Sequence, residues 1–206
     1  MNTTKIECKR HIDDCPQITD LEIMLYLSMS GTLSENIVRV YPRDTEQSIA
    51  EYSFDITCTH CREAHGSPVF INAYEKHEMA GSRGEASFTM KCKFCGNEMS
   101  INLSHFEEAL WNSEAESYDS GSITTSRKKH GIKNVSGNAG LLLQLDCRGC
   151  DISKFNPQNI TFVVELQQGK MECIIEEGED EWYDYDDNQG EEVSITEIKF
   201  DIIKGK

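Results

Sequence analysis

Long hydrophobic runs are absent from this sequence of 206 residues. None approaches the ~18 apolar residues needed to cross a bilayer, and the first residues lack the charged-then-apolar profile of a secretory signal. Basic residues are also scarce, with 20 Lys and Arg against 36 Asp and Glu and a net charge of −16. Nucleic-acid phosphates are held by clustered basic side chains. We therefore expect a soluble protein of the cytoplasm, or of cytoplasm and nucleus, that binds neither membrane nor nucleic acid.

Recognisable catalytic motifs are absent too. The sequence has no Ser/His/Asp set, no phosphate-binding loop and no HExxH motif, so no enzymatic activity is predicted. Cysteine, in contrast, is well represented, with nine residues. An odd number of cysteines outside a secretory context is typical of a reducing compartment, where cysteines bind metals or stay as thiols.

Four of these cysteines form two CxxC pairs separated by 30 residues. Each pair can direct two sulfurs at one ion while backbone N–H groups donate to them. Apolar alternation before each pair places it at the end of a strand. Because structural zinc prefers four tetrahedral ligands, we predict one Zn²⁺ site formed by Cys58, Cys61, Cys92 and Cys95.

The same pairs are compatible with a disulfide framework, a redox dithiol or plain buried thiols. A disulfide framework requires an oxidising compartment. A thioredoxin-like CxxC opens a helix after a strand, whereas β-like alternation resumes after both pairs here. The paired spacing therefore favours zinc. Two histidines beside the first pair, His60 and His65, are expected to be exposed rather than ligands, because four thiolates already fill the shell.

At least seven segments alternate apolar and polar residues with a period of two, which is typical of half-buried β-strands. The longest covers residues 21–30. A change of phase between Ile195 and Ile198 predicts a β-bulge in the last strand. The sequence therefore predicts an all-β fold, a sandwich or barrel-like pair of sheets with few helices.

Composition divides the chain into an N-terminal extension expected to be flexible (1–18), a first β half with the zinc site (19–111), an insertion (112–138) and a second β half (139–206). The insertion lacks apolar periodicity and is expected to be flexible. The second half contains an acidic loop, 176–192, with ten acidic residues in seventeen. Its aromatic residues indicate that part of the loop packs down.

Two further groups of cysteines have ligand-like spacing. One lies in the N-terminal extension, at Cys8, His11 and Cys15, where three ligands on a flexible segment make a weak site. The other begins 89 residues after the first pair, follows apolar alternation and suggests a duplicated β unit. It is a candidate three-thiolate site made of Cys147, Cys150 and Cys173, although unligated thiols are the preferred interpretation.

Three blocks of sequence carry a resemblance to a known family. They are GSRGEASFTMKCKFC around the second pair, LDCRG with FNPQ downstream, and WYDYD followed by EEVSITEI. In this order they resemble the eukaryotic CXXC-motif-containing zinc-binding proteins, a domain of unknown function, over about residues 19–203.

The resemblance implies an all-β protein of two similar, intertwined halves related by a pseudo-dyad. It also implies zinc bound by Cys58, Cys61, Cys92 and Cys95. The family shares residues 147–149 but has no constant cysteine at position 150. It implies no established reaction.

The leading hypothesis is a non-enzymatic, monomeric zinc-binding protein with a structural four-cysteine site and an acidic surface that binds a protein partner. Four thiolates leave no open position for a catalytic water. The alternative is a metal carrier or thiol-redox protein, which requires a labile ion and accessible sulfurs of low pKa.

Overall fold

The computed structural model describes residues 23–79, 83–106, 108–133, 135 and 139–205. Within these residues the chain forms fifteen β-strands and one α-helix, so the all-β prediction is confirmed. No helix in this part of the chain is long and apolar enough to cross a membrane.

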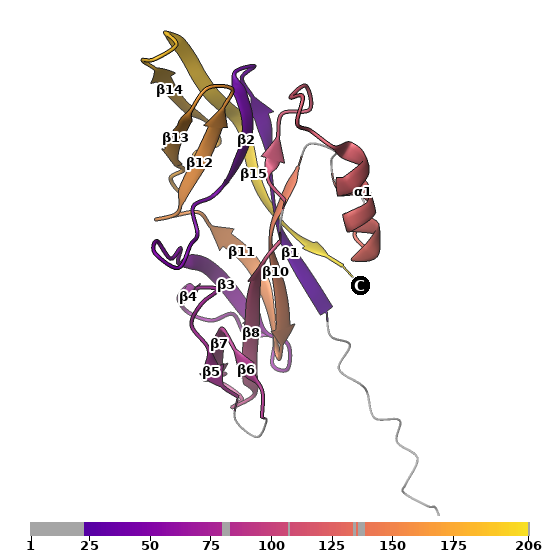
Figure 1. Cartoon of the computed structure of the whole chain (residues 1–206). Helices are drawn as coiled ribbons and strands as arrows, with labels where there is room; N and C mark the ends of the chain where they lie inside the picture. Colours follow the sequence, from indigo (N-terminus) through magenta and orange to yellow (C-terminus); the bar gives the residue numbers. More distant parts are fainter. Residues whose placement is uncertain (1–22, 80–82, 107, 134, 136–138, 206) are drawn as a thin grey trace, which may run out of the picture.

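The largest sheet has six antiparallel strands in the order β14-β15-β1-β10-β8-β7. Their bounds, in that order, are Trp182–Asp186, Glu191–Lys204, Ile23–Leu33, Gly140–Arg148, Glu98–His105 and Phe88–Lys91. The central strands run along the elongated molecule, and the edge strands β14 and β7 lie toward its opposite ends (Figure 1).

Two smaller sheets and one short hairpin complete the fold. The sheet β11-β3-β4 consists of Cys150–Asn156, Tyr52–Cys58 and Val69–Ile71. The sheet β13-β12-β2-β9 consists of Lys170–Ile174, Thr161–Leu166, Ile37–Pro42 and Leu110–Trp111. The hairpin joins β5 and β6, which are His77–Glu78 and Glu85–Ala86.

The strand order is symmetric about the central β1–β10 pair. Exchanging β1 with β10 also exchanges β15 with β8 and β14 with β7, and it converts β2-β12-β13 into β11-β3-β4. Each small sheet mixes the two halves, because β2 of the first half pairs with β12 of the second and β11 of the second pairs with β3 of the first. This is the arrangement of two intertwined halves related by a pseudo-dyad.

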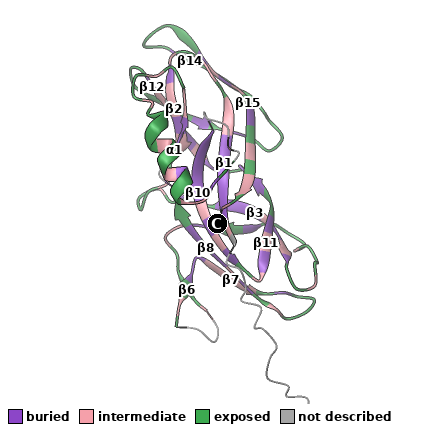
Figure 2. Ribbon diagram, turned by 90° about the vertical axis from the view of Figure 1, so that its right-hand side faces the viewer, coloured by how far each residue is buried: buried purple, intermediate pink, exposed green. Residues whose placement is uncertain are grey.

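Strand β1 is buried on both faces, so the prediction that it is half-buried was wrong. Residues 25–29 are all buried, and both β1 and β10 run through the interior in Figure 2. Leu25 and Leu27 belong to the main core. On the other face Tyr26 packs in a second cluster with Phe106, Ile132 and Leu141. Residues from distant parts of the chain cover that face, and the alternation within β1 does not report them.

The stretch 112–138, which was expected to be a flexible insertion, contains helix α1, Ser120–Lys129. The Asp119 carboxylate caps the helix by accepting from two backbone N–H groups of the first turn. The helix is held to the body by an ion pair of 2.9 Å between Arg127 and Glu108, whose side chains are 10% and 6% exposed. Hydrophobic periodicity does not detect a helix docked in this way.

Two features of the last hairpin agree with the sequence. The register of β1 against β15 shifts between Ser30 and Thr32, and Glu197 has φ 55°, which confirms the predicted bulge. Strand β14 lies inside the acidic stretch 176–192, and its last residue, Asp186, is buried. Part of the acidic stretch therefore packs down, and Trp182 packs against the main core, but Tyr183 and Tyr185 are exposed.

The end of β8 is tied to the loop after β2 by a charged hydrogen bond. His105 Nε2 lies 2.6 Å from Asp44 Oδ2, and the Asp44 side chain is 2% exposed. The hydrogen bond to Asp44 raises the pKa of His105 above its ordinary value of 6.5, although burial opposes this. Burial alone would raise the pKa of Asp44, but hydrogen bonds from His105, Ala50 and Tyr52 outweigh it and lower that pKa below 3.8.

This pair makes stability depend on pH. The contribution of protonated His105 is fully present below its ordinary pKa of 6.5 and is lost as pH rises through the raised value. The contribution of Asp44 is present above pH 3.8 and is lost as pH falls through its lowered pKa. We expect the melting temperature of the wild type to exceed that of His105→Gln by more at pH 5.5 than at pH 8.5. An equal difference at both pH values would contradict the assignment.

Candidate metal centre

The two CxxC turns meet at one end of the molecule although they belong to different sheets. Cys58 is the last residue of β3, and Cys92 directly follows β7. The sulfur of Cys58 lies 3.8 Å from that of Cys95, and the sulfur of Cys61 lies 3.6 Å from that of Cys92. All four sulfur atoms lie within 4.8 Å of one another.

These separations fit a tetrahedral metal site. With bonds of ~2.3 Å from zinc to sulfur, the edge of a tetrahedron is about 3.8 Å. A disulfide would bring two sulfurs to about 2.05 Å, and the four cysteines are free thiols. The structure therefore brings together the four predicted residues in an arrangement that can hold a tetrahedral ion with sulfur ligands.

The two turns have nearly the same backbone geometry. The Cys58 carbonyl accepts from the N–H of Arg62 at 3.0 Å, and the Cys92 carbonyl accepts from the N–H of Gly96 at 2.9 Å. Arg62 has φ 65° and Gly96 has φ 74°. A positive φ after the last cysteine of each turn directs the following backbone N–H groups toward the sulfurs.

Backbone N–H groups act on the acidity of the thiols. The Cys61 N–H is the main cause that lowers the pKa of Cys58 to about 6. The N–H groups of Cys95 and Phe94 lower the pKa of Cys92. The N–H of Glu63 also favours the Cys61 thiolate, but burial and the neighbouring thiols outweigh it and raise that pKa to about 12. The pKa values of these neighbouring thiols are therefore shifted in opposite directions. A divalent cation would stabilise all four as thiolates.

The centre is built into the protein on one side and open on the other. Cys58 and Cys92 are buried in the main core, Cys61 packs against it, and Cys95 is exposed. Phe94, between the second pair, is 69% exposed. Two ligands are therefore shielded by core packing, whereas one is in contact with solvent.

The CRGC segment, residues 147–150, lies beside this centre and is hydrogen-bonded to residues that flank its cysteines. The Gly149 carbonyl accepts from the Thr59 N–H at 3.1 Å and from Asn97 Nδ2 at 3.3 Å. Asn97 Nδ2 also lies 3.9 Å from the Cys58 sulfur, and Cys150 pairs with Cys58 across β11 and β3. Sequence reasoning did not assign this role to Asn97 or Gly149. The glycine of the LDCRG block was the available signal.

The suggested correspondence between the first CxxC pair and the cysteines 89 residues later, Cys147 and Cys150, was wrong. The pseudo-dyad relates the metal centre to the turns after β12 and β14, not to the end of β10. In the turn after β14 the N–H of Gly190 donates to the Asp186 carbonyl at 2.7 Å, and Gly190 has φ 72°, as in the second CxxC turn. A hydrogen bond of 3.2 Å between Gln189 and Gln168 joins the two related turns. The turn after β14 therefore keeps the backbone geometry of the second CxxC turn without its cysteines.

The other predicted ligands are not gathered in the same way. Cys147 and Cys150 are hydrogen-bonded to each other, but Cys173 lies on β13 in a different sheet. Across the described ranges, one group of three or more potential ligands is this close together, and it contains only Cys58, Cys61, Cys92 and Cys95. His60 and His65 are outside the group. The positions of Cys8, His11 and Cys15 lie outside the described residues.

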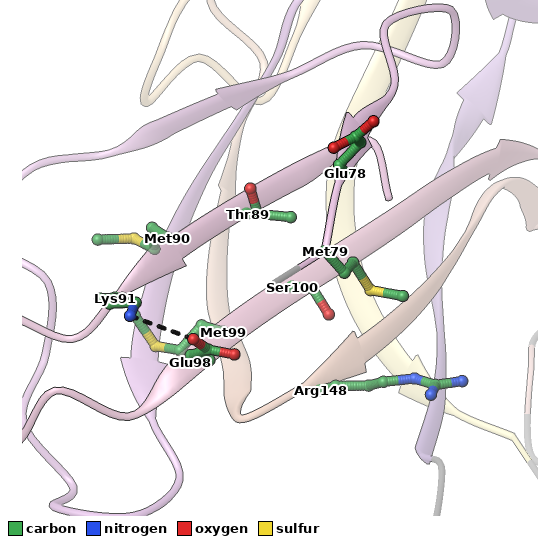
Figure 3. A pocket seen from close by; sticks show the side chains of 9 residues that line it. All are labelled: Glu78, Met79, Thr89, Met90, Lys91, Glu98, Met99, Ser100 and Arg148. Atoms are coloured by element: carbon green, nitrogen blue, oxygen red, sulfur yellow. Dashed lines mark ion pairs between the residues drawn. The ribbon is translucent and has the colours of Figure 1, made fainter. Parts of the chain in front are cut away.

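A groove of about 350 Å³, lined by three methionines and six polar or charged residues, lies beside the centre. Figure 3 shows Met79, Met90 and Met99 along it, with an ion pair of 3.2 Å between Lys91 and Glu98 at one end. Met99 also lines the small hollow beside Cys58 and Cys92. Met99 therefore lies between the groove and the metal centre.

Fold and site together define an all-β protein with a cluster of four cysteines that can hold a metal ion. Comparison with known sequences identifies the class more closely. The chain belongs to the family of eukaryotic CXXC motif containing zinc binding proteins, whose sequence model matches residues 26–203.

The UPF0587 protein YCR090C of Saccharomyces cerevisiae is 48% identical over 183 residues, which cover 88% of this chain and 99% of that protein. The CXXC motif containing zinc binding protein of Homo sapiens is 25% identical over 178 residues, covering 86% and 96%. The solved structure titled "Crystal Structure of C1orf123" superimposes with a TM-score of 0.65 at 22% identity, covering 88% and 99%. This last similarity concerns the fold.

Proposed function

We propose that the centre binds one Zn²⁺ ion and that its role is structural, in a non-enzymatic, monomeric cytoplasmic protein. The observation that carries the proposal is the tetrahedral spacing of the four sulfurs, with all of them within 4.8 Å. Sulfur-only tetrahedral coordination is the preference of structural zinc. The name of the family is consistent with this ion.

The arrangement of the ligands supports a structural role. Cys58 comes from the three-stranded sheet and Cys92 follows the edge strand β7 of the six-stranded sheet. An ion bound by both pairs would join these two sheets directly, in addition to contacts such as the ion pair between Lys204 of β15 and Asp151 of β11. Four thiolates also leave no position for a reacting water.

We also propose that the protein binds a protein partner through its acidic hairpin. Tyr183 and Tyr185 on β14 are 62% and 50% exposed, within the acidic stretch 176–192. Exposed tyrosines are common at protein interfaces, and the surrounding carboxylates favour a basic partner. Figure 1 places this hairpin at the end of the molecule away from the β5, β6 and β7 strands.

The test of the structural role is metal analysis combined with unfolding. The purified, reduced protein should contain one zinc per chain, retain it against a mild chelator and melt at a much lower temperature after a strong chelator removes it. Zinc binding and the melting temperature are linked, because a ligand that binds only the folded state stabilises that state. Easy loss of zinc with an unchanged melting temperature would refute the structural role.

A metal carrier or thiol-redox protein is the second candidate. The exposure of Cys95 favours it, because a reacting partner can reach that sulfur, whereas Cys58, whose pKa is lowered, is buried. Rapid transfer of zinc to a competing chelator at neutral pH, with the fold intact, would select this candidate.

A further inference from the structure

A second cavity, of about 300 Å³, lies away from the metal centre where the sheets meet. Strand β2 and strand β9 of the four-stranded sheet line one side of it, and residues at and after the end of β8 line the other. Cavities between packed units of a fold are common sites for small ligands. This cavity contains groups of two kinds that favour a particular ligand chemistry.

The first group is the guanidinium of Arg39. It lies 5.0 Å from the ring centre of Tyr41 and 5.0 Å from that of Trp111, so two aromatic rings fix its position. Its Nε and Nη2 donate to Glu165 Oε2 at 3.0 and 2.9 Å. Among the hydrogen bonds of the described residues, none uses its Nη1 group. Arg39 is therefore oriented in advance and keeps donor capacity.

The second group is the imidazole of His105. Its Nε2 donates to the buried Asp44 carboxylate at 2.6 Å, and Asp44 is itself held by the N–H of Ala50 and the hydroxyl of Tyr52, both at 3.0 Å. Burial of Asp44 makes a protonated partner favourable. The His105 side chain is 40% exposed, so its other ring nitrogen can be reached from solvent.

The carboxylates of the cavity wall are already neutralised by other groups. Asp44 accepts from His105, and Glu108 accepts from Arg127 at 2.9 Å and from the Leu141 N–H at 3.2 Å. Glu165, beside the wall, accepts from Arg39 and has Lys170 at 3.4 Å. Although the chain has a net charge of −16, the carboxylates in and beside this cavity do not outnumber the positively charged side chains that pair with them.

We propose that the cavity binds a small anion, through a phosphate or carboxylate group held between Arg39 and His105. Arg offers planar paired donors to such oxyanions, and a histidine fixed by a carboxylate adds a second donor. The site is independent of the zinc centre and of the proposed protein interface.

The experiment is an NMR titration of the full-length, zinc-loaded protein with inorganic phosphate. We expect saturable shifts of the Trp111 indole, the His105 ring and the Arg39 Nε signals, and none of this size with sodium chloride at the same ionic strength. A parallel titration with succinate distinguishes the two anion chemistries, because the preferred one saturates at lower concentration. The absence of saturable shifts with both anions would overturn the proposal without affecting the zinc assignment.

Two matched variants locate the site. Arg39→Gln should weaken binding at least tenfold, because it removes the fixed guanidinium. Arg43→Gln removes the same charge nearby, but Arg43 pairs with Glu172 and does not line the cavity, so binding should be unchanged. Equal losses in both variants would reduce the effect to general electrostatics and refute a site. Wild-type shifts confined to residues outside the cavity would also refute it, whatever the variants do.

Discussion

Cys92→Ser is expected to abolish tight zinc binding and to lower the stability of the protein sharply. In the wild type, the sulfur of Cys92 lies 3.6 Å from that of Cys61, and the Cys92 side chain is part of the main core. Serine is a poor zinc ligand, so the ion would keep three thiolates. At a free zinc concentration a thousandfold above the dissociation constant, bound zinc contributes about 4 kcal/mol of stability, which the variant would lose. Metal content and thermal unfolding with and without a strong chelator measure the effect.

Cys173→Ser is the matched control. Cys173 is also buried, at 1% exposed against 6% for Cys92, but lies on β13 outside the cysteine cluster. Burying a hydroxyl there should cost about 1–3 kcal/mol, while zinc content and the response to chelator remain those of the wild type. If the melting temperature of Cys92→Ser still fell on chelation as much as that of the wild type, the assignment of Cys92 as a ligand would be wrong.

Gly149→Ala is expected to destabilise the protein by about 3 to 5 kcal/mol, because overlap and backbone strain add. A Cβ at this position would lie 2.2 Å from the Glu98 carbonyl oxygen and 2.9 Å from Asn97 Nδ2, and Gly149 has φ +71°. The shift would also disturb the carbonyl that holds Thr59 and Asn97 behind the metal centre. Denaturant unfolding gives the loss of stability, and competition with a chelator gives the expected loss of zinc affinity.

Gly178→Ala separates the two causes. Gly178 has φ +91°, but a Cβ there would meet no atom within 4 Å. Only backbone strain remains, which costs about 1–2 kcal/mol, and zinc affinity should not change. Similar losses for Gly149→Ala and Gly178→Ala would show that the overlap with Glu98 relaxes without cost.

The cluster of four cysteines was predictable because the sequence information for it is local. Each CxxC pair defines its own turn, and a glycine at position 96 marks the positive φ that closes the second one. The spacing of two such pairs then leaves few alternatives to one shared ion. The strand alternation of β15 and its bulge were predictable for the same reason, since both depend on neighbours in sequence.

The parts of the structure that were not predicted depend on contacts between residues far apart in the sequence, which no local sequence pattern indicates. Helix α1 docks through the pair of Arg127 and Glu108, so its apolar periodicity is weak, although the cap at Asp119 and the basic last turn were available signals. The CRGC segment resembled a third ligand pair but is a support for the first, because β11 pairs with β3 of the other half. Pairing between distant strands decides such questions, and hydrophobic alternation does not specify the partner of a strand.

The exchange of strands between the two halves has a consequence for synthesis on the ribosome. Strands β2 and β3 emerge early, but their partners β12 and β11 are made only after residue 149, so neither small sheet can be completed by the first half. All four cysteines of the metal centre precede residue 96. A nascent chain can therefore bring these four cysteines together while much of its sheet pairing is still missing. The ion would then close a long loop early, at a stage when non-local contacts are otherwise the slow step of folding.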